Sequence, residues 1–433
     1  MIFNEKIECM GREELKNLQS ERLKKLVAYI YDNNPVYRKK LDQHGIGPAS
    51  VKSIDDIVNL PFTTKEDMRD NYPFKLFSRP VSEISEIHVS SGTTGNPTVV
   101  GYTKDDLDLW SEVVARAIAC AGGVPGDMIQ IAYGYGLFTG GLGLHYGALK
   151  LGCTILPMSS GQTKRQLKLM TDFQPRILCC TPSYTLYMLD EAREMGLDPR
   201  ASSWKIGIFG AEPWSDTMRT EIEQAWNMLA TDIYGLSEIT GPGVSQECAH
   251  KCGMHICSDV FYPEVIDSVT GNAMPEGEYG ELVFTTLTKQ GIPLLRYRTR
   301  DIVSINYEQC VCGRTSPRMS KVRGRTDDMI IVRGINVFPS QIEHVLLGIE
   351  GVQPHYQLIV ERSVGGLDDL EIQVEIEEPF FSDEIKVLEN LKQKIAREME
   401  SVLGINAKIR FVEPKTIQRS EGKAKRVIDK RTL

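Results

Sequence analysis

The chain has 433 residues, of which 41% are hydrophobic and 25% are charged, and its net charge is −8 at pH 7. This composition is typical of a globular protein with two or more domains, and the acidic balance argues against a nucleic-acid-binding surface or a basic membrane-docking face. No apolar run approaches a membrane span and the first residues lack the apolar core of a signal peptide, so a cytoplasmic protein is expected. The ten cysteines are not a disulfide scaffold in a chain of this length.

The N-terminal part of the chain predicts helices followed by a strand. Apolar residues recur at helical spacing in two long stretches, whereas a shorter stretch alternates between apolar and polar residues. The expected elements are a helix over residues 13–31 ended by Pro35, a turn over 61–67 leading into a helix with Thr63 or Thr64 as its N-cap, a strand over 84–89, and a helix over 104–121.

The segment of residues 90–98 follows the predicted strand and is rich in glycine and hydroxyl side chains. Glycines let the backbone turn sharply and expose its N–H groups, and hydroxyls can donate to phosphate oxygens. The segment differs from a Walker A loop because no lysine follows Gly95. It therefore indicates a nucleotide phosphate site, with an ordinary polar turn as the alternative.

Short apolar runs then alternate with helical stretches. Strands are expected over residues 129–132, 154–157, 176–180 and 205–209, and helices over 164–173, 184–194 and 215–226. This order predicts α/β units with largely parallel strands. Ligands bind beyond the carboxyl ends of such strands, so the loops after them are the places to look for a site.

Two further textures complete the chain. Residues 260–306 predict β-structure, with strands over 261–267 and 280–285. From about residue 325 the pattern predicts a compact α+β unit: a hairpin over 329–337 turning at Arg333-Gly334, a helix over 339–347, strands over 356–361 and 370–377, a helix over 382–402 and a strand over 407–412. The predicted domains are residues 1–326 and 327–433.

Four more motifs carry candidate chemistry. In residues 234–238, Tyr-Gly-Leu-Ser-Glu, the aromatic ring could stack on a base and the carboxylate could hold Mg²⁺ against phosphates. In residues 296–301, Arg-Tyr-Arg-Thr-Arg-Asp, the final carboxylate could accept both hydroxyls of a ribose. Residues 324–328 and 419–425 are the other two. Each is weak alone, because a lysine near a chain end is usually a solvated charge and an Arg-Tyr-Arg is usually a salt-bridged strand end.

Taken in order, the five motifs resemble those of the adenylate-forming superfamily of acyl-CoA synthetases, adenylation domains and luciferases. The resemblance extends from about Ser90 to Lys423. Three strings look more like the phenylacetate-CoA ligase branch: residues 208–214, 234–243 and 325–340. The resemblance implies an α/β fold in which a large N-terminal domain, with mixed and parallel sheets, packed helices and a β segment, precedes a small mobile α+β C-terminal domain.

The resemblance also implies two half-reactions. A carboxylate attacks the α-phosphorus of Mg·ATP to give an acyl-adenylate and pyrophosphate. The thiolate of coenzyme A (CoA) then attacks the mixed anhydride and releases AMP. Positioning and charge neutralisation would account for most of the catalysis in the first step. The expected activity is an acid–thiol ligation with phenylacetate as substrate, in phenylacetate catabolism, with indoleacetate or another arylacetate as possible substitutes.

Individual roles follow from the same resemblance, and the catalytic residues would be Lys423, Glu238 and Arg325. Lys423 would bridge the substrate carboxylate and the ribose–phosphate oxygens during adenylation. The phosphates would lie on Ser90, Ser91, Gly92, Thr93, Thr94 and Gly95. The remaining nucleotide contacts would be Glu238 to Mg²⁺, Ala211, Glu212 and Pro213 to adenine, Tyr234 and Gly235 beside the base, Asp301 to the ribose hydroxyls, and Arg325 to ribose or phosphate. Asp327 would be the hinge, and Arg333 and Gly334 would reach the CoA channel after the C-terminal domain rotates.

The acyl pocket is predicted from residues 133–141, which are aromatic and glycine-rich. Glycines on one side and aromatic rings on the other would shape a flat slot for a ring. The residues chosen for the pocket are Tyr133, Phe138, Ala211 and Pro242. The alternative is that the glycines only allow a helix and a strand to pack closely.

Two clusters of cysteine and histidine, in residues 248–257 and 310–312, predict a structural zinc site with four nitrogen or sulfur ligands. Free thiols in loops are the alternative. Because some branch members resemble this chain in both clusters, the chosen ligands are Cys248, His255, Cys310 and Cys312, with Cys252 and Cys257 as substitutes. In the branch, a Trp and an acidic residue usually precede the position of Asp259, where this chain has Cys257 and Ser258; adenine contacts near Asp259 are therefore in doubt.

Two other functions compete with the ligase reading. A stand-alone adenylation enzyme would load an aryl acid onto a carrier-protein thiol, and its choice of acceptor would distinguish it from a CoA ligase. A zinc-organised binding protein on a decayed enzyme scaffold would not need Lys423, Glu238 and Asp301 together. Expected partners are an aryl acid, ATP and CoA, with no nucleic acid and no membrane, and the resemblance implies a homodimer.

Overall fold

The computed structural model describes residues 1–90, 96–326, 330–332, 335–337, 339–362, 368–376, 385–403, 406–418 and 426–430. The chain forms two compact units. The first comprises Met1–Cys180, Ser202–Ala211 and Met228–Lys321, and the second comprises Thr181–Ala201, Glu212–Asn227 and Val322–Leu433. The predicted division into an N-terminal domain of residues 1–326 and a mobile C-terminal domain of residues 327–433 stays a prediction.

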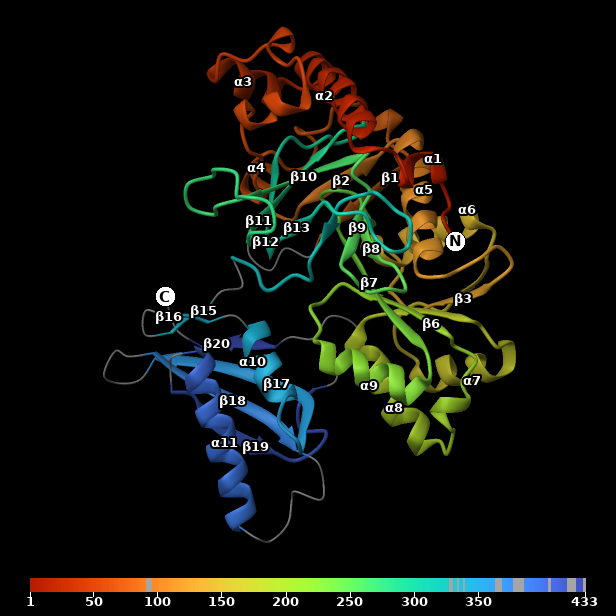
Figure 1. The fold of residues 1–433 in the computed structure, drawn as a ribbon, viewed down its shortest axis with the longest axis vertical. Coiled ribbons are helices and arrows are strands. Elements are labelled where there is room, and N and C mark those ends of the chain that lie inside the picture. Colours follow the sequence, from red (N-terminus) through yellow and green to blue (C-terminus); the bar gives the residue numbers. More distant parts are fainter. Residues whose placement is uncertain are drawn as a thin grey trace. The chain divides into compact units, whose positions relative to one another are not determined.

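A nine-stranded sheet forms the centre of the first unit (Figure 1), and its strands follow the order β13-β14-β9-β8-β7-β6-β5-β3-β4. Strands β4, β3, β5, β6 and β7 run parallel, and the others continue the sheet antiparallel. Every residue of β5 and β6 is buried, as expected for parallel strands covered on both faces. The bounds are β3 (Met128–Ile131), β4 (Thr154–Pro157), β5 (Ile177–Cys180), β6 (Ile206–Gly210), β7 (Leu229–Leu236), β8 (Gly241–Glu247), β9 (Met254–Ile256), β13 (Ile305–Asn306) and β14 (Arg318–Met319).

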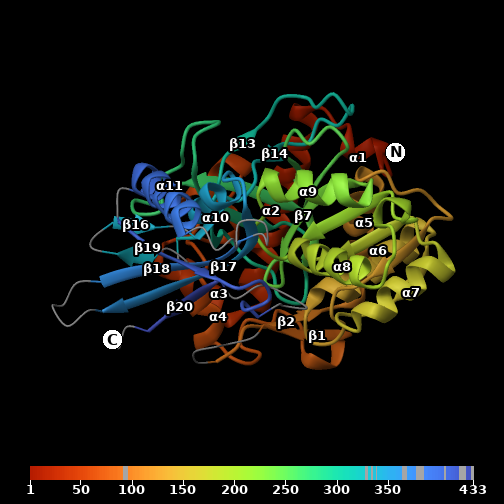
Figure 2. The same ribbon diagram turned by 90° about the horizontal axis from the view of Figure 1, so that it is seen from below.

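Helices α5 (Lys104–Cys120) and α6 (Thr139–Leu151) lie side by side in both ribbon views (Figures 1 and 2). Helix α5 begins with a capping box in which Thr103 and Asp106 each bond the other's backbone N–H. Helix α7 (Thr163–Phe173) follows β4. These helices bury apolar faces in the core of the first unit, which includes Trp110, Trp204, Phe209 and Phe284.

The first unit also holds an N-terminal helical region and two smaller sheets. Helix α2 buries Leu23, Val27 and Ile30 on one face and contacts α3. The helices are α1 (Glu5–Glu8), α2 (Arg12–Asn33), α3 (Pro35–Gln43) and α4 (Lys65–Asp70). One antiparallel sheet contains β1 (Glu86–Val89) and β2 (Val99–Tyr102), and the other contains β10 (Phe261–Ile266), β11 (Gly280–Thr286) and β12 (Tyr297–Val303).

The second unit contains a four-stranded sheet in the order β19-β18-β17-β20, against which α10 and α11 pack (Figure 1). Its core includes Ile342, Leu358, Ile372, Ile395 and Met399. The elements are α8 (Pro182–Glu194), α9 (Asp216–Trp226), the antiparallel pair β15 (Ile330–Val332) and β16 (Ile335–Val337), α10 (Pro339–Leu347), β17 (Val352–Arg362), β18 (Asp368–Ile376), α11 (Ile385–Leu403), β19 (Lys408–Val412) and β20 (Val427–Asp429).

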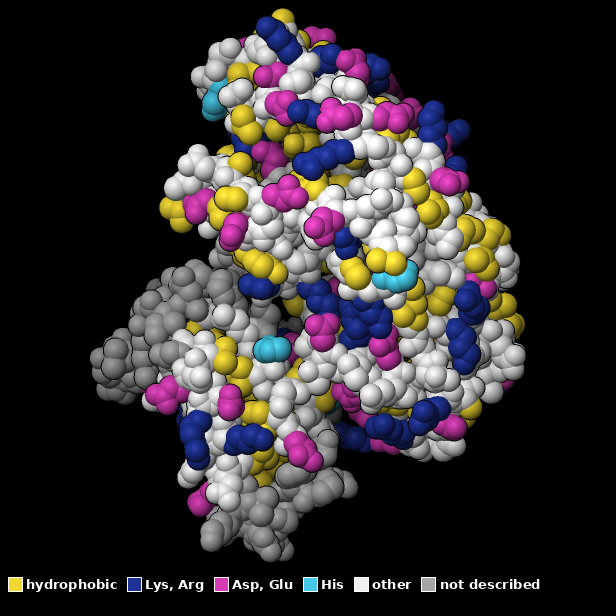
Figure 3. All heavy atoms as spheres, viewed as in Figure 1, with side chains coloured by type: hydrophobic (Ala, Val, Ile, Leu, Met, Phe, Trp, Pro, Cys, Tyr) yellow, Lys and Arg dark blue, Asp and Glu magenta, His cyan; other side chains and the backbone are white. Residues whose placement is uncertain are grey.

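The predicted fold class is confirmed: an α/β protein with a large N-terminal part built on a mixed sheet and a small α+β C-terminal part. No helix in the described ranges is both long enough and apolar enough to span a membrane. Side chains of both charge signs are interspersed over the face shown in Figure 3. The mobility of the C-terminal part stays a prediction.

Two local differences from the predicted elements have physical reasons. Helix α2 ends before Pro35 as expected, but Pro35 also starts α3, because a proline in the first helical turn lacks only an N–H that would have no helical acceptor. The Asn34 side chain caps α3 by accepting from the backbone N–H groups of Val36 and Tyr37, each at 3.1 Å. Helix α6 was not expected, because its glycines have low helix propensity.

Candidate functional site

The ends of the predicted phosphate loop are fixed by the β1–β2 hairpin. Val89 and Val99 are paired across it, and the Ser90 N–H donates to the Thr98 carbonyl at 3.0 Å. The hydroxyls of Ser90 and Thr98 also contact each other, and Thr98 is buried. Residues 91–95, which would hold the phosphates, lie outside the described residues.

The segment Leu137–Thr139 connects this hairpin to the turn that carries Glu238. The Leu137 carbonyl accepts from the Val89 N–H at 3.1 Å, and His88 Nδ1 lies 3.0 Å from the same oxygen. Two residues later, Thr139 Oγ1 lies 3.1 Å from Ser237 Oγ. The start of the phosphate loop and the Glu238 turn are therefore both hydrogen-bonded to the segment Leu137–Thr139.

Glu238 lies in the turn between β7 and β8, and its side chain is 8% exposed. The Lys65 ammonium, at the start of α4, is 3.9 Å from Glu238 Oε1. Lys289 donates to the Glu238 carbonyl at 3.3 Å and to the Ile239 carbonyl at 2.8 Å. Burial lowers the pKa of Lys289 to about 8, although the carboxylates of Asp106 and Glu238 act in the opposite direction.

Asp301 and Tyr234, predicted to bind ribose and base, meet in the structure. The Tyr234 hydroxyl donates to Asp301 Oδ2 at 2.5 Å, and the Asp301 side chain is 4% exposed. Strand β12 alternates so that Asp301 points inward with Thr299, while Arg298 lies on the other side. The two oxygens of a carboxylate offer about four lone-pair sites, so this type of side chain can accept from both hydroxyls of a ribose.

Ala211 lies next to this pair, at the carboxyl end of β6. Gly210 and Ile233 are partners in the parallel β6–β7 ladder, so Ala211, which directly follows β6, lies beside Tyr234 in β7. Ala211 has a φ of 68°, which is uncommon for a residue other than glycine. Gly235 is required by packing, because a Cβ there would lie 1.7 Å from the Gly241 carbonyl oxygen.

The arginines of the Arg-Tyr-Arg motif form ion pairs. Arg296 donates to both oxygens of Glu264, at 3.1 and 2.8 Å, and Arg298 donates to both oxygens of Glu281, at 3.0 and 2.5 Å. These two arginines are therefore salt-bridged, as the alternative interpretation expected, while Asp301 bonds to Tyr234.

The predicted acyl-pocket residues have different environments. Tyr133 is buried, Pro242 is half-buried, and Phe138 is 55% exposed. Trp110 Nε1 donates to the Pro242 carbonyl at 3.1 Å. A Cβ on Gly141 would lie 2.7 Å from the Gly134 carbonyl oxygen, so at this position the glycine does allow close packing, as the alternative reading expected. The pocket itself stays a prediction.

The four chosen cysteine and histidine residues come together. Their ligand atoms all lie within 4.8 Å of one another, with Cys248 Sγ 3.8 Å from Cys310 Sγ and Cys312 Sγ 3.4 Å from His255 Nε2. His255 Nδ1 is 3.2 Å from Ser316 Oγ, and Arg314 Nη1 donates to Cys312 Sγ at 3.7 Å. Burial raises the pKa of the Cys312 thiol, but the hydrogen bonds with His255 and Arg314 lower it more.

The two substitute cysteines lie elsewhere. Cys252 is exposed and its thiol donates to the His250 carbonyl at 3.2 Å. Cys257 is buried and accepts from Gln246 Nε2 at 3.8 Å. Neither belongs to the group of four, so the structure favours the chosen set as the candidate metal ligands.

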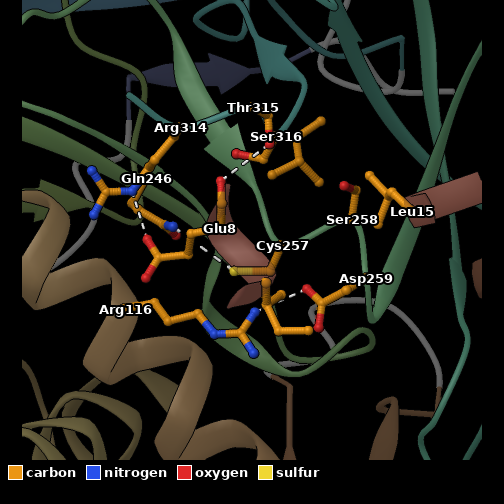
Figure 4. Close-up of a pocket in the computed structure, with 12 residues that line it drawn as sticks. Glu8, Leu15, Arg116, Gln246, Cys257, Ser258, Asp259, Arg314, Thr315 and Ser316 are labelled. Carbon is orange, nitrogen blue, oxygen red and sulfur yellow. Dashed lines mark hydrogen bonds and ion pairs between the residues drawn. The ribbon is translucent and has the colours of Figure 1, made fainter. Parts of the chain in front are cut away.

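A small pocket near this cluster is lined by ion pairs (Figure 4). Arg116 donates to Asp259 Oδ1 at 2.9 Å, and Arg314 donates to Glu8 Oε2 at 2.6 Å. Arg22 also donates to the Asp259 backbone carbonyl. In the described part of the chain, Asp259 therefore belongs to an ion-pair network that joins the N-terminal helices to the sheet.

The remaining predicted residues divide into two groups. Glu212, Pro213 and Arg325 belong to the second unit; Glu212 accepts from the Ser183 N–H at 2.7 Å, and Arg325 is half-buried. Outside the described residues are Ser91, Gly92, Thr93, Thr94, Gly95, Asp327, Arg333, Gly334 and Lys423. Their roles stay predictions.

Sequence reasoning missed Lys65, Tyr102 and Lys289 as neighbours of Glu238. Lys65 was considered only as part of a helix start, and Lys289 stands in a polar loop where a solvated lysine is the ordinary expectation. No local pattern identifies them, because each contact with the Glu238 turn is long-range.

Comparison with known proteins gives consistent matches. The profile of the family described as AMP-binding enzyme matches residues 13–287, and the profile of the AMP-binding enzyme C-terminal domain matches residues 334–431. The phenylacetate-coenzyme A ligase of Thermus thermophilus is 49% identical over 445 aligned positions, covering 100% of both chains. That of Escherichia coli is 47% identical, covering 100% of this chain and 99% of its own.

Among solved structures, 2-hydroxyisobutyryl-CoA ligase in the postadenylation state, in complex with R3-HIB-AMP, matches with a TM-score of 0.91. It is 29% identical, and the match covers 98% of this chain and 91% of that one. The likeness therefore extends over both the sequence and the fold of nearly the whole chain.

Proposed function

The chain belongs to the AMP-binding enzyme family and to its phenylacetate-coenzyme A ligase branch, and from this premise we propose that it ligates phenylacetate to CoA. The phenylacetate carboxylate attacks the α-phosphorus of ATP, forming phenylacetyl-adenylate and releasing pyrophosphate. The CoA thiolate then attacks the acyl carbon, forming the thioester and releasing AMP. The observation that carries this proposal is the full-length similarity to ligases of this activity.

The geometry of the first unit supports the nucleotide part of the proposal. Asp301 and Tyr234 would hold the ribose and the base at the strand ends beside Ala211, and the hairpin ends at Ser90 and Thr98 would present the phosphate loop. Lys423 and Arg325 would neutralise phosphate charge during adenylation. Asp327 would act as the hinge before CoA enters beside Arg333 and Gly334.

The residues present fit a magnesium ion bound with the nucleotide. Mg²⁺ is usually held by one or two carboxylates together with phosphate oxygens. Glu238 offers such a carboxylate, with the basic Lys65 side chain 3.9 Å away. The segment Leu137–Thr139, which contacts the start of the phosphate loop, also contacts the neighbouring residue Ser237. When bound, the ion would neutralise phosphate charge; Glu238 would orient it.

The cysteine–histidine cluster fits a structural zinc ion. Tetrahedral zinc with Zn–S bonds of about 2.3 Å places its sulfur ligands about 3.8 Å apart, and Cys248 and Cys310 are 3.8 Å apart. The other ring nitrogen of His255, Nδ1, lies within hydrogen-bond distance of the Ser316 hydroxyl. Zinc-bound histidines commonly have such a hydrogen bond at the nitrogen that does not bind the metal. We propose Cys248, His255, Cys310 and Cys312 as the ligands.

Pyrophosphate release from Mg·ATP, measured with arylacetates, benzoates and short fatty acids, tests the proposed activity. We expect release driven by phenylacetate, with phenylacetyl-CoA and AMP formed when CoA is present. Pyrophosphate release without transfer to CoA, but with transfer to a carrier protein, would favour the alternative of a carrier-loading enzyme. Folded protein that releases pyrophosphate with none of these acids would contradict the proposal.

Asp301→Asn is expected to raise the KM for ATP by about 10- to 100-fold, because a hydrogen bond to a charged group contributes about 1.5–3 kcal/mol. Tyr234→Phe, which removes only the hydroxyl that donates to Asp301, is the matched control and should raise it by about two- to fivefold. Steady-state kinetics at saturating phenylacetate measure both. An unchanged KM in Asp301→Asn would remove Asp301 from the ribose site.

A homodimer, a cytoplasmic location and a role in phenylacetate catabolism remain predictions. Sedimentation of the purified protein would decide the first of these.

A further inference from the structure

Lys289 is a buried lysine in the first unit, placed in the loop between β11 and β12. Its side chain is 3% exposed. The ammonium donates to two consecutive backbone carbonyls, those of Glu238 at 3.3 Å and Ile239 at 2.8 Å. Both carbonyls belong to the turn that carries the proposed magnesium ligand.

Tyr102 completes the support of this turn. Its hydroxyl donates to the Ser237 carbonyl at 3.3 Å, so Tyr102 and Lys289 together hold three consecutive carbonyls. The Lys289 ammonium also lies 4.7 Å from the centre of the Tyr102 ring, a cation–π contact. Tyr102 is itself stacked on Trp110, with ring centres 5.1 Å apart.

The loop that carries Lys289 is fixed by Asp106, a buried carboxylate in the first turn of α5. Asp106 accepts from the backbone N–H groups of Gln290 and Gly291, each at 2.8 Å, and from that of Thr103 at 3.0 Å. The backbone next to Lys289 therefore cannot move without breaking these bonds. The loop from which the Lys289 side chain extends to the Glu238 turn is therefore held in place.

Such an arrangement costs stability, because a buried ammonium loses its hydration and two carbonyls replace it only in part. An apolar side chain of similar length could fill the space. The charged donor instead fixes the peptide bonds on either side of the Ile239 α-carbon, and the Tyr102 hydroxyl bonds the carbonyl of the peptide bond between Ser237 and Glu238. The peptide bonds on both sides of the Glu238 α-carbon are thereby held, and this sets the direction in which the Glu238 side chain leaves the backbone.

We propose that Lys289 is a positioning residue that fixes the Glu238 turn, so that the Glu238 carboxylate is held ready for the metal ion of the metal–ATP complex. This inference rests on the proposed function, since it takes Glu238 as the magnesium ligand. Lys289 itself touches neither metal nor nucleotide in this role. It acts through the backbone of residues 238 and 239.

Lys289→Met tests the inference, since methionine keeps an unbranched chain and removes the donors. Equilibrium binding of Mn²⁺ together with α,β-methylene-ATP, which cannot be cleaved at the α-phosphorus, needs no acid substrate. We expect the variant to bind this pair about tenfold or more weakly, and metal-free nucleotide within about twofold of wild type, because a displacement of about 1 Å can cost up to 100-fold.

Kinetics separate positioning from a general structural defect. In Lys289→Met the half-saturating Mg²⁺ concentration for pyrophosphate release should rise about tenfold, with the KM for phenylacetate and the rate of CoA transfer from supplied phenylacetyl-adenylate within about twofold of wild type. In Lys289→Arg, which keeps a charged donor, the half-saturating Mg²⁺ concentration should lie between those of wild type and Lys289→Met. Lys205→Met is the control. Lys205 also donates to a backbone carbonyl, that of Ser202 at 3.1 Å, but it lies just before β6, at the end of the strand opposite to Ala211.

Tyr102→Phe provides a second variant if Lys289→Met does not fold. It removes only the bond to the Ser237 carbonyl, and we expect it to weaken Mn²⁺·nucleotide binding by about two- to fivefold. Wild-type metal dependence in folded Lys289→Met, or equal loss of both half-reactions, would overturn the inference. If wild type binds the metal–nucleotide pair but does not react with phenylacetate, the proposed substrate is wrong while the binding comparison still decides the role of Lys289.

Discussion

Lys423→Ala is expected to lower the rate of pyrophosphate release by about 100- to 1,000-fold, as removal of a single charge-stabilising donor does in other active sites. The family resemblance gives Lys423 the role of bridging the attacking carboxylate and the ribose–phosphate oxygens. Negative charge is concentrated there in the adenylation step, and an ammonium both lowers the repulsion and orients the carboxylate. Rapid-quench measurement with phenylacetate and Mg·ATP gives the rate of this step.

The second half-reaction is the internal comparison for Lys423→Ala. When phenylacetyl-adenylate is supplied, transfer to CoA should stay within about threefold of wild type, because the proposed domain rotation removes Lys423 from the site before the thiolate attacks. Lys430→Ala is the matched control, since Lys430 pairs with Glu361 at 2.5 Å and both side chains are half exposed. An exposed ion pair of this kind contributes about 0–1 kcal/mol to the free energy of unfolding, so Lys430→Ala should leave the fold and both half-reactions nearly unchanged. Equal loss of both half-reactions in Lys423→Ala would contradict the assigned role.

Local pattern was sufficient for most of the fold. The parallel strands β4, β5 and β6 and the helices between them follow from short apolar runs and helical periodicity, and α10 was predicted with its observed bounds. Where prediction failed, another interaction decided the structure. Helix α6 forms despite its glycines because it packs against α5, and β7 and β8 pair around Gly235, where the residues themselves give little strand signal.

The candidate site was predicted as separate motifs, and the structure adds how they meet. Tyr234 and Asp301 are 67 positions apart, so the hydrogen bond between them has no signature in either motif. Lys289 is 51 positions from Glu238, and a lysine in a polar loop looks like a solvated charge until its burial is seen. Sequence reasoning therefore found the residues that resemble a family motif and missed those that support them through the backbone.

Cys310→Ser is expected to abolish zinc binding and to lower the apparent melting temperature by about 5–10 °C, corresponding to about 2–4 kcal/mol. Cys248 follows β8, His255 lies in β9, and Cys310 and Cys312 lie between β13 and β14. A bound ion would join segments 62 positions apart, and such a link stabilises the fold chiefly by restricting the unfolded chain. Metal content per chain and thermal unfolding, with and without a chelator, measure the two effects.

Cys252→Ser is the matched control, because Cys252 is exposed and lies outside the four-residue cluster. It should keep the zinc content and melting temperature of wild type. Adenylation at 25 °C should fall by less than about threefold in Cys310→Ser, because Tyr234 is on β7 and the cluster is held by the strands beyond it. Wild-type protein without zinc after growth in zinc-supplemented medium, or a chelator that leaves its melting temperature unchanged, would show that these four residues are free thiols and an imidazole gathered by packing alone.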